Sequence, residues 1–283
     1  MAKDGYKIKS LEPMNMVSPF IMVNRTGSSN YFSDRIDITV AEEYIRKKRK
    51  EGLKGFGMLH LFLAAYVRTV SQRPGINRFI RGQRVYARNN IEIEMTIKKE
   101  LKLDAPETCI KAEYEPTATA DEVYHVFNNL VDEYKNTSNE SSFDNVAKIL
   151  KYIPGVLLKF VIFILKMLDY FGLLPRFLTK LSPFHGSLFI TSMGSLGIPP
   201  IYHHLYDFGN LPIFLSYGAK YEESKMDKDG NITTSKYIDF CVVTDERICD
   251  GHYYASAFKY LKSIFSHPDI LDNPPETVVK DIK

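Results

Sequence analysis

The sequence predicts an α/β fold in which helices pack on a mixed β-sheet. Segments with helical periodicity alternate with strand patterns along the 283 residues, which favours helices packed on a sheet. A polar Asp-Gly loop at 225–231 also joins two strand patterns directly, and such a hairpin requires antiparallel strands. The two observations together favour a mixed sheet over a regular doubly wound one.

Composition excludes several classes of protein. Hydrophobic residues make up 45% and charged residues 25%, as in soluble globular proteins. The net charge is only +3, and apart from one basic run at 46–50 the basic residues are scattered along the chain, so no nucleic-acid partner is expected. Cys109, Cys241 and Cys249 lack metal-ligand spacing, so we expect reduced thiols and no metal site. The polar start has no signal-peptide core, which predicts a cytoplasmic protein.

The first half of the chain carries the patterns of several helices and strands. Two capping boxes, Thr39 with Glu42 and Thr119 with Glu122, mark helix starts, because each pair satisfies the first helical amides reciprocally. We expect helices at 39–51, 58–71 and 119–134, and strands at 30–39, 79–80, 84–88, 91–98 and 108–114.

The second half is predicted to complete the sheet. Strands are expected at 187–192, 211–219 and 236–243, followed by a last helix at 252–265. We expect an extended arm at 1–17 and a frayed tail at 272–283. One domain therefore spans 18–271, with an insertion at about 139–185.

Residues 149–178 of that insertion are almost continuously apolar. Lys159, Lys166 and Asp169 interrupt the stretch, so its charge-free runs are shorter than the roughly 18 residues that a membrane span needs. Three interpretations stay open. The helix is buried, as a roof over a substrate channel or between subunits, or it lies on a membrane surface with its lysines facing anionic headgroups. The third interpretation, which the charges disfavour, is a membrane span.

Two motifs carry information about chemistry. Residues 244–251 read Thr-Asp-Glu-Arg-Ile-Cys-Asp-Gly and lie between a strand pattern and a helix pattern. Residues 186–198, about fifty positions earlier, read Gly-Ser-Leu-Phe-Ile-Thr-Ser-Met-Gly-Ser-Leu-Gly-Ile. Both motifs and their spacing resemble the superfamily of chloramphenicol acetyltransferase and the catalytic domain of dihydrolipoamide acyltransferase.

The resemblance implies a fold, an activity and an assembly. The fold would be that of chloramphenicol acetyltransferase, and the activity would be transfer of an acyl group from a coenzyme A thioester to a small-molecule acceptor. It also implies a homotrimer with the active site at the subunit interface. The lipoyl and subunit-binding domains of dihydrolipoamide acyltransferases have no counterpart in this sequence, so a stand-alone catalytic-type domain is expected.

The first motif supplies the expected binding residues. Thr191 falls at the position of the hydroxyl that stabilises the oxyanion in the family. Ser192, Gly194 and Gly197 belong to the same segment, and the resemblance implies that they contact the coenzyme A substrate.

The second motif departs from the family. Glu246 stands where the family has its catalytic histidine, so Glu246 is either the base or a partner in an ion pair with Arg247 or another arginine. Asp250 matches a structural aspartate, which either pairs with an arginine, for which Arg25 and Arg35 are candidates, or caps the last helix.

Three histidines are candidate substitutes for the missing base, and they are His203, His204 and His252. The resulting hypotheses are an acyltransferase with altered catalysis, a non-catalytic protein that binds acyl groups or coenzyme A, and a membrane-associated scaffold.

Overall fold

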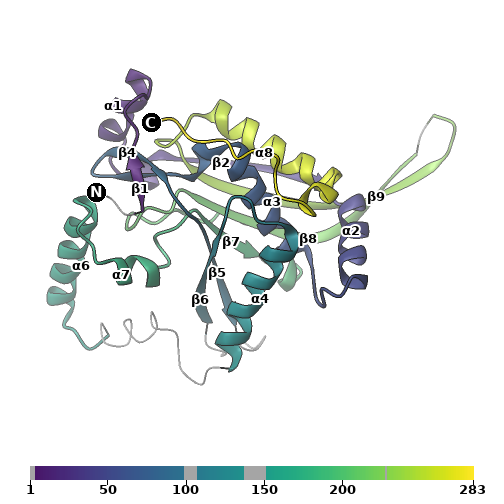
Figure 1. Ribbon diagram of the computed structural model, residues 1–283, viewed down its shortest axis with the longest axis horizontal. Coiled ribbons are helices and arrows are strands. Elements are labelled where there is room, and N and C mark those ends of the chain that lie inside the picture. The colour runs from purple at the N-terminus through teal and green to yellow at the C-terminus, as the bar shows by residue number, and fades with distance from the viewer. Residues whose placement is uncertain (1–3, 99–106, 137–150, 227) are drawn as a thin grey trace.

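A computed structural model describes residues 4–98, 107–136, 151–226 and 228–283 (Figure 1). Its main feature is a six-stranded sheet in the order β2-β9-β8-β7-β5-β6. The strand β7 runs parallel to β5 and β8, and the other pairs are antiparallel, so the predicted mixed sheet is confirmed. The strands are β2 (Ser29–Asp37), β5 (Ile91–Lys98), β6 (Glu107–Tyr114), β7 (Leu188–Ser192), β8 (Ile213–Met226) and β9 (Ile232–Asp245).

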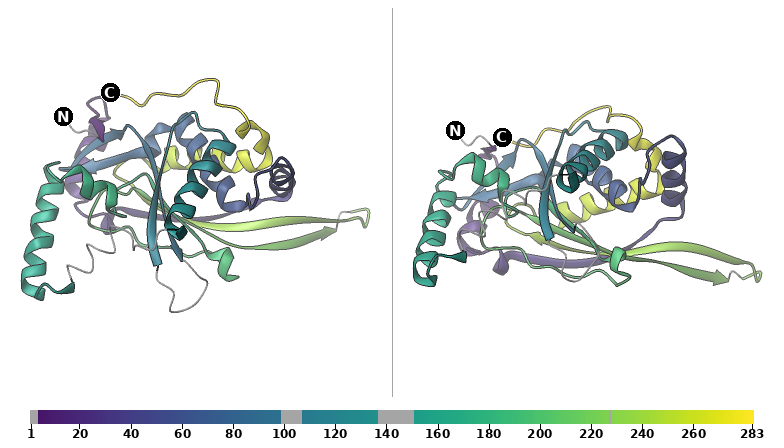
Figure 2. Two further views of the ribbon diagram at one scale, coloured as in Figure 1. Left: turned by 60° about the horizontal axis from the view of Figure 1, so that its bottom comes forward. Right: turned by 90° about the horizontal axis from the view of Figure 1, so that it is seen from below.

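Helices cover one face of this sheet, as Figure 2 shows. The central helix is buried along nearly its whole length, because apolar side chains cover its circumference. Its Phe62 stacks on Tyr217 of β8 and packs against Phe265 of the last helix, with ring centroids 4.5 and 4.7 Å apart. The helices are α2 (Thr39–Lys50), α3 (Met58–Gln72), α4 (Ala120–Asn136) and α8 (Gly251–Ser266).

The opposite face of the sheet has a thinner cover. A smaller apolar cluster forms there from Phe189, Leu205, Leu211, Phe214 and Val243. The hairpin of β8 and β9 extends beyond the body of the molecule (Figure 2). A separate small sheet has the order β1-β4-β3, with strands at Gly5–Lys7, Arg84–Arg88 and Arg78–Arg81.

The predicted helix starts differ in outcome. The box at Thr119 is confirmed: its amide donates to the Glu122 carboxylate at 2.8 Å, and its hydroxyl accepts from the Glu122 amide at 3.3 Å. The box at Thr39 is wrong. The Thr39 hydroxyl accepts from the amide of Lys236, and the Glu42 carboxylate bonds to lysines of β8 and β9. The neighbouring strands supply a main-chain amide for the Thr39 hydroxyl and two ammonium groups for the Glu42 carboxylate, and these bonds replace the reciprocal pair.

Both chain ends are more ordered than the sequence predicts. The expected arm contains β1 and a helix, α1 (Pro13–Ile21). The expected frayed tail is fixed by an ion pair: Asp281 accepts two hydrogen bonds from Arg78, at 2.7 and 2.6 Å, and both side chains are buried. The Val279 amide also donates to the carbonyl of Ser71 at 2.8 Å.

The insertion contains two helices, α6 (Gly155–Tyr170) and α7 (Arg176–Leu181), and residues 139–150 lie outside the described residues. No residue of α6 is buried, so the prediction of a roof buried in its own chain is wrong. The Tyr170 hydroxyl donates to the Gln83 amide oxygen at 2.9 Å, which attaches α6 to the turn between β3 and β4. No helix within the described ranges is long and apolar enough to cross a bilayer.

Acid should weaken the packing of α3 through His60. This ring is buried against Phe56 and Tyr124, and burial lowers its pKa to about 4. An unfolded chain protonates the same ring near pH 6.5, so its contribution is complete above that pH and is lost as pH falls through about 4. The loss amounts to about 2–3 kcal/mol at pH 4.5.

His60→Gln removes this titration while an amide oxygen can still accept from the Gly57 amide, which donates to the His60 ring at 3.1 Å. Urea unfolding at pH 7 and pH 4.5 should show a smaller acid loss in the variant than in the wild type. Equal losses in the two proteins would contradict the assignment.

The tail ion pair predicts a second stability effect. Asp281→Asn leaves the buried Arg78 guanidinium without its carboxylate, so it should lower the free energy of unfolding by about 3 kcal/mol. Asp269→Asn is the matched control, because Asp269 is exposed and makes no side-chain bond within the described residues. Equal midpoints for the two variants in urea would show that the tail adds little stability.

Candidate functional site

Thr191 lies near the end of β7, on the sheet face opposite to the helix layer. Leu188 and Ile190 pack in the main core, whereas Phe189 joins the smaller cluster, so alternation along the strand places Thr191 on the side of Phe189. Its register partner on β8 is Ser216. The Thr191 side chain is half-buried, and its hydroxyl has no hydrogen bond within the described residues, so it is available to a ligand.

The loop after β7 is docked on a bulge in β8. At Gly194 an added Cβ would lie 2.5 Å from the carbonyl oxygen of Gly218, which excludes any side chain. Gly197 has φ of +73°, in the left-handed region that favours glycine. Ser192 turns to the helix side, beside its register partner Tyr217. These contacts explain the motif structurally, and coenzyme A binding by Ser192, Gly194 and Gly197 stays a prediction.

His203 lies on the same face as Thr191. Its ring stacks on Phe214 with centroids 4.0 Å apart, and Phe214 stacks on Phe189. Burial lowers the pKa of His203, which favours the neutral ring. Its Nδ1 lies 2.9 Å from the carbonyl oxygen of His204, which can only accept, so Nδ1 carries the proton and Nε2 is left as a proton acceptor. His204 itself is exposed.

Glu246 directly follows β9 and is exposed. Its backbone amide donates to the carbonyl of Ser28 at 2.9 Å, which fixes the position of the residue. Within the described ranges its carboxylate has no hydrogen bond or ion pair. The predicted pair with Arg247 is wrong, because that guanidinium binds Asp245 with two bonds of 2.8 and 2.7 Å.

The predicted arginine partners also bind elsewhere. The guanidinium of Arg25 is buried 3.7 Å from Asp245, and burial lowers its pKa to about 10. Arg35 pairs with Glu223 on the long hairpin. Asp250 therefore takes the other predicted role: its carboxylate accepts from the amide of Tyr253 at 2.7 Å and caps α8.

Thr191 and Glu246 are far apart within one chain. Ser216, the partner of Thr191, pairs with Cys241 on β9, so two strand spacings separate Thr191 from β9. Glu246 lies five residues beyond Cys241, and strand geometry gives a separation on the order of 20 Å. His252 is exposed in the first turn of α8, also outside the surroundings of Thr191. One copy of the chain therefore does not bring Glu246 or His252 to Thr191.

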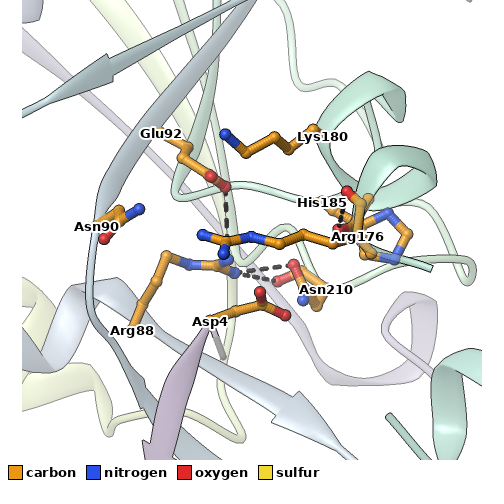
Figure 3. A pocket seen from close by; sticks show the side chains of 9 residues that line it. Asp4, Arg88, Asn90, Glu92, Arg176, Lys180, His185 and Asn210 are labelled. Atoms are coloured by element: carbon orange, nitrogen blue, oxygen red, sulfur yellow. Dashed lines mark hydrogen bonds and ion pairs between the residues drawn. The ribbon is translucent and has the colours of Figure 1, made fainter. Parts of the chain in front are cut away.

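The sequence did not indicate a polar pocket beneath α7 (Figure 3). Arg88 and Glu92 face it from the sheet side, and Arg176 and Lys180 face it from α7. The Arg88 side chain is only 3% exposed and donates to the Asn210 side chain at 2.8 Å. The pocket volume of about 20 Å³ holds one or two water-sized molecules, so it cannot take an acyl thioester.

A buried Ser-His-Asp arrangement lies beside this pocket. The His185 ring is 2.8 Å from the Ser182 hydroxyl through Nδ1 and 3.2 Å from the Asp169 carboxylate through Nε2. Burial lowers the pKa of His185. Ser182 is itself buried, so a substrate has no access to its hydroxyl. The arrangement attaches α6 to the segment before β7, which is a structural role. Within the described residues, no group of three potential ligands is placed to hold a metal ion.

Comparison with known proteins supports the fold. No family model and no curated protein matches the sequence. Among solved structures, a probable dihydrolipoamide acetyltransferase from Listeria monocytogenes is 14% identical in sequence. The match spans 92% of this chain and 95% of the Listeria chain, with a TM-score of 0.59.

Two further structures agree with it. The cubic core of the pyruvate dehydrogenase multienzyme complex is 13% identical over 93% of each chain, with a TM-score of 0.55. A chloramphenicol acetyltransferase is 12% identical over 89% of this chain and 94% of its own, with a TM-score of 0.52. The chain therefore has the fold shared by chloramphenicol acetyltransferase and the catalytic cores of dihydrolipoamide acetyltransferases.

Proposed function

We propose that the protein binds an acyl thioester of coenzyme A and transfers the acyl group to a small-molecule acceptor. The proposal rests on one observation: the polar side chains of Thr191 and Glu246 are free to bind a ligand. Thr191 and Glu246 both lie at the ends of sheet strands, and the chain leaves the hydroxyl and the carboxylate unbonded within the described residues. A hydroxyl donor can stabilise the tetrahedral oxyanion, and a carboxylate can take the proton of the acceptor.

The proposed site lies between copies of the chain. Roughly 20 Å of separation excludes a reacting centre that uses both groups of one copy, because reacting atoms must approach to about 3–3.5 Å. A closed homotrimer solves this problem if each interface pairs Thr191 of one copy with Glu246 of the next. His203 lies on the face of Thr191, with Nε2 as an acceptor, and is the first of the three histidines to test as a helper.

Subunit complementation tests this arrangement. Thr191→Val removes the oxyanion donor, Glu246→Gln removes the base, and each variant alone should lose about 10²–10³-fold in thiol release from acetyl-CoA. When the two variants are co-expressed as mixed trimers, about one quarter of the interface sites combine an intact Thr191 with an intact Glu246. Activity should therefore return to about a quarter of the wild-type value. Absence of any recovery would overturn the proposed pairing of Thr191 with Glu246 across an interface.

A non-catalytic protein that binds acyl groups or coenzyme A is the second candidate. The reference pKa is about 4.3 for glutamate and about 8.5 for a thiol. Transfer of a proton from a thiol acceptor to Glu246 is therefore unfavourable by about four pKa units, or near 6 kcal/mol. An apolar surrounding would narrow this gap, but Glu246 is exposed in the single chain. Wild-type protein that binds acetyl-CoA in calorimetry and releases no thiol would favour this candidate. Absence of binding at millimolar acetyl-CoA would exclude both.

A peripheral membrane contact is proposed for α6. Its Val156, Phe160, Phe163 and Met167 are exposed along one stripe of the helix. Lys159 and Lys166 lie at one edge of that stripe and have no ion pair within the described residues. Exposed apolar side chains flanked by lysines are typical of a helix that lies on an anionic bilayer. The protein would then be cytoplasmic and attached at the membrane surface.

Co-sedimentation with phosphatidylglycerol vesicles tests this contact. The wild type should pellet with the vesicles, and Phe163→Glu should stay in the supernatant because a charge is placed in the apolar stripe. Leu196→Glu is the control, since Leu196 is equally exposed but lies in the loop after β7. Wild type that remains in the supernatant contradicts the proposal. A lower mass of Phe163→Glu in light scattering would instead assign α6 to a contact between copies.

A further inference from the structure

A groove separates α8 from the strands β2 and β9, and neither motif predicted it. Its volume is about 350 Å³, within the size range of ligand sites in proteins. The walls are aromatic, from Phe32 and Phe240 on the strands and Tyr254 and Phe258 on α8. Phe32 meets Phe258 edge-on, with ring centroids 4.8 Å apart. We call this site the α8 groove.

The inner end of the α8 groove carries two unbonded polar side chains. Thr244 and Asn30 are direct register partners on β9 and β2, so both side chains emerge on the face that α8 covers. Thr244 is fully buried, and its hydroxyl has no hydrogen-bond partner. The Asn30 amide has none either within the described residues. An unpaired buried hydroxyl costs about 1–3 kcal/mol, so a ligand group that bonded to it would recover that energy.

Tyr254 also lines the groove and carries a hydroxyl. The Tyr254 hydroxyl donates to the carbonyl oxygen of Asp245 at 3.0 Å and is buried. The proton of the Tyr254 hydroxyl is therefore not available to the Thr244 oxygen.

The rim of the groove is positive. Lys259 is exposed on α8 and has no ion pair within the described part of the chain. Lys262 also lines the rim but binds Asp34, so that pair adds no net charge. Lys259 is therefore the unpaired positive charge at the rim, and a carboxylate is the group that complements a single ammonium.

We propose that the α8 groove binds an aromatic carboxylate that bears a second hydrogen-bonding group. The ring lies among Phe32, Tyr254 and Phe258, where its apolar surface is removed from water. The second polar group bonds at the inner end to Thr244 and Asn30, and the carboxylate lies at Lys259. The site faces the helix layer, whereas Thr191 lies on the opposite side of the sheet, so the inference does not rest on the proposed acyl transfer.

Calorimetry with 3-(4-hydroxyphenyl)propanoate tests the site on the full chain. This probe should bind with a submillimolar Kd. Thr244→Val should weaken it about tenfold, because the variant keeps the shape and loses the hydroxyl. Thr244→Ser restores a hydroxyl and should bind within about twofold of the wild type.

Charge is tested separately with a matched pair of ligands. Lys259→Gln should weaken the carboxylate probe severalfold and leave the uncharged 3-(4-hydroxyphenyl)propanamide unchanged. Lys54→Gln is the control, since Lys54 is an exposed lysine in the turn between α2 and α3. Failure of the wild type to bind the probe at 5 mM overturns the proposal. Binding that is equal in wild type, Thr244→Val and Lys259→Gln overturns it as well, because the probe then lies elsewhere.

Wild-type protein that releases thiol from acetyl-CoA but does not bind the probe would contradict the groove proposal alone. Wild-type protein that binds the probe but releases no thiol would contradict the acyl-transfer proposal alone. The two hypotheses therefore fail in distinguishable ways.

Discussion

The buried carboxylate of Asp245 is the interaction on which the site end of the molecule depends. It is 2% exposed and accepts from the Ser28 hydroxyl at 3.0 Å and from Arg247, while Arg25 lies 3.7 Å away. Those arginines in turn donate to main-chain carbonyls. Arg25 binds carbonyls of the segment at 206–209, and Arg247 binds the carbonyls of residues 22 and 23, directly after α1. Breaking such a buried pair typically costs about 3–5 kcal/mol, because an unpaired charge is left behind.

This arrangement separates the position of Glu246 from its chemistry. The residue is placed by its amide bond to Ser28 and by the fixed Asp245 before it, and its own side chain makes no contribution within the described residues. A position held by the backbone tolerates an exchange of side chain without loss of the fold. That is why a carboxylate can stand where the resemblance implies an imidazole while the sheet, the docked loop at Gly194 and the α8 cap all keep their geometry.

The sequence predicted the elements well because period and capping are local properties. The helix at 58–71 and the strands at 84–88 and 91–98 occur within a residue of their predicted bounds. Partners distant in sequence were not predictable. Arg78 and Asp281 are separated by 203 positions, and nothing near either residue signals the pair that orders the tail. The same holds for the pairing of Arg25 with Asp245 rather than Asp250, since both carboxylates belong to the same motif.

Thr244 and Glu246 show how one strand end can serve two surfaces. Thr244 lines the α8 groove, and Glu246 is exposed directly after the end of β9, with Asp245 fixed between them. Alternation along β9 sends Asp245 to the face opposite to Thr244, and Glu246 follows after the end of the strand. Arg25, Arg247 and Ser28 all interact with the Asp245 carboxylate. A ligand bound at Thr244 is therefore expected to leave Asp245 in place. Energetic coupling between the groove and Glu246 would require a connecting element that can adopt two conformations. Asp245 is the residue that connects them, and its buried ion pair holds it in one conformation. We therefore expect the proposed ligand of the groove and the proposed acyl transfer to be independent of each other, although both sites lie on the same scaffold.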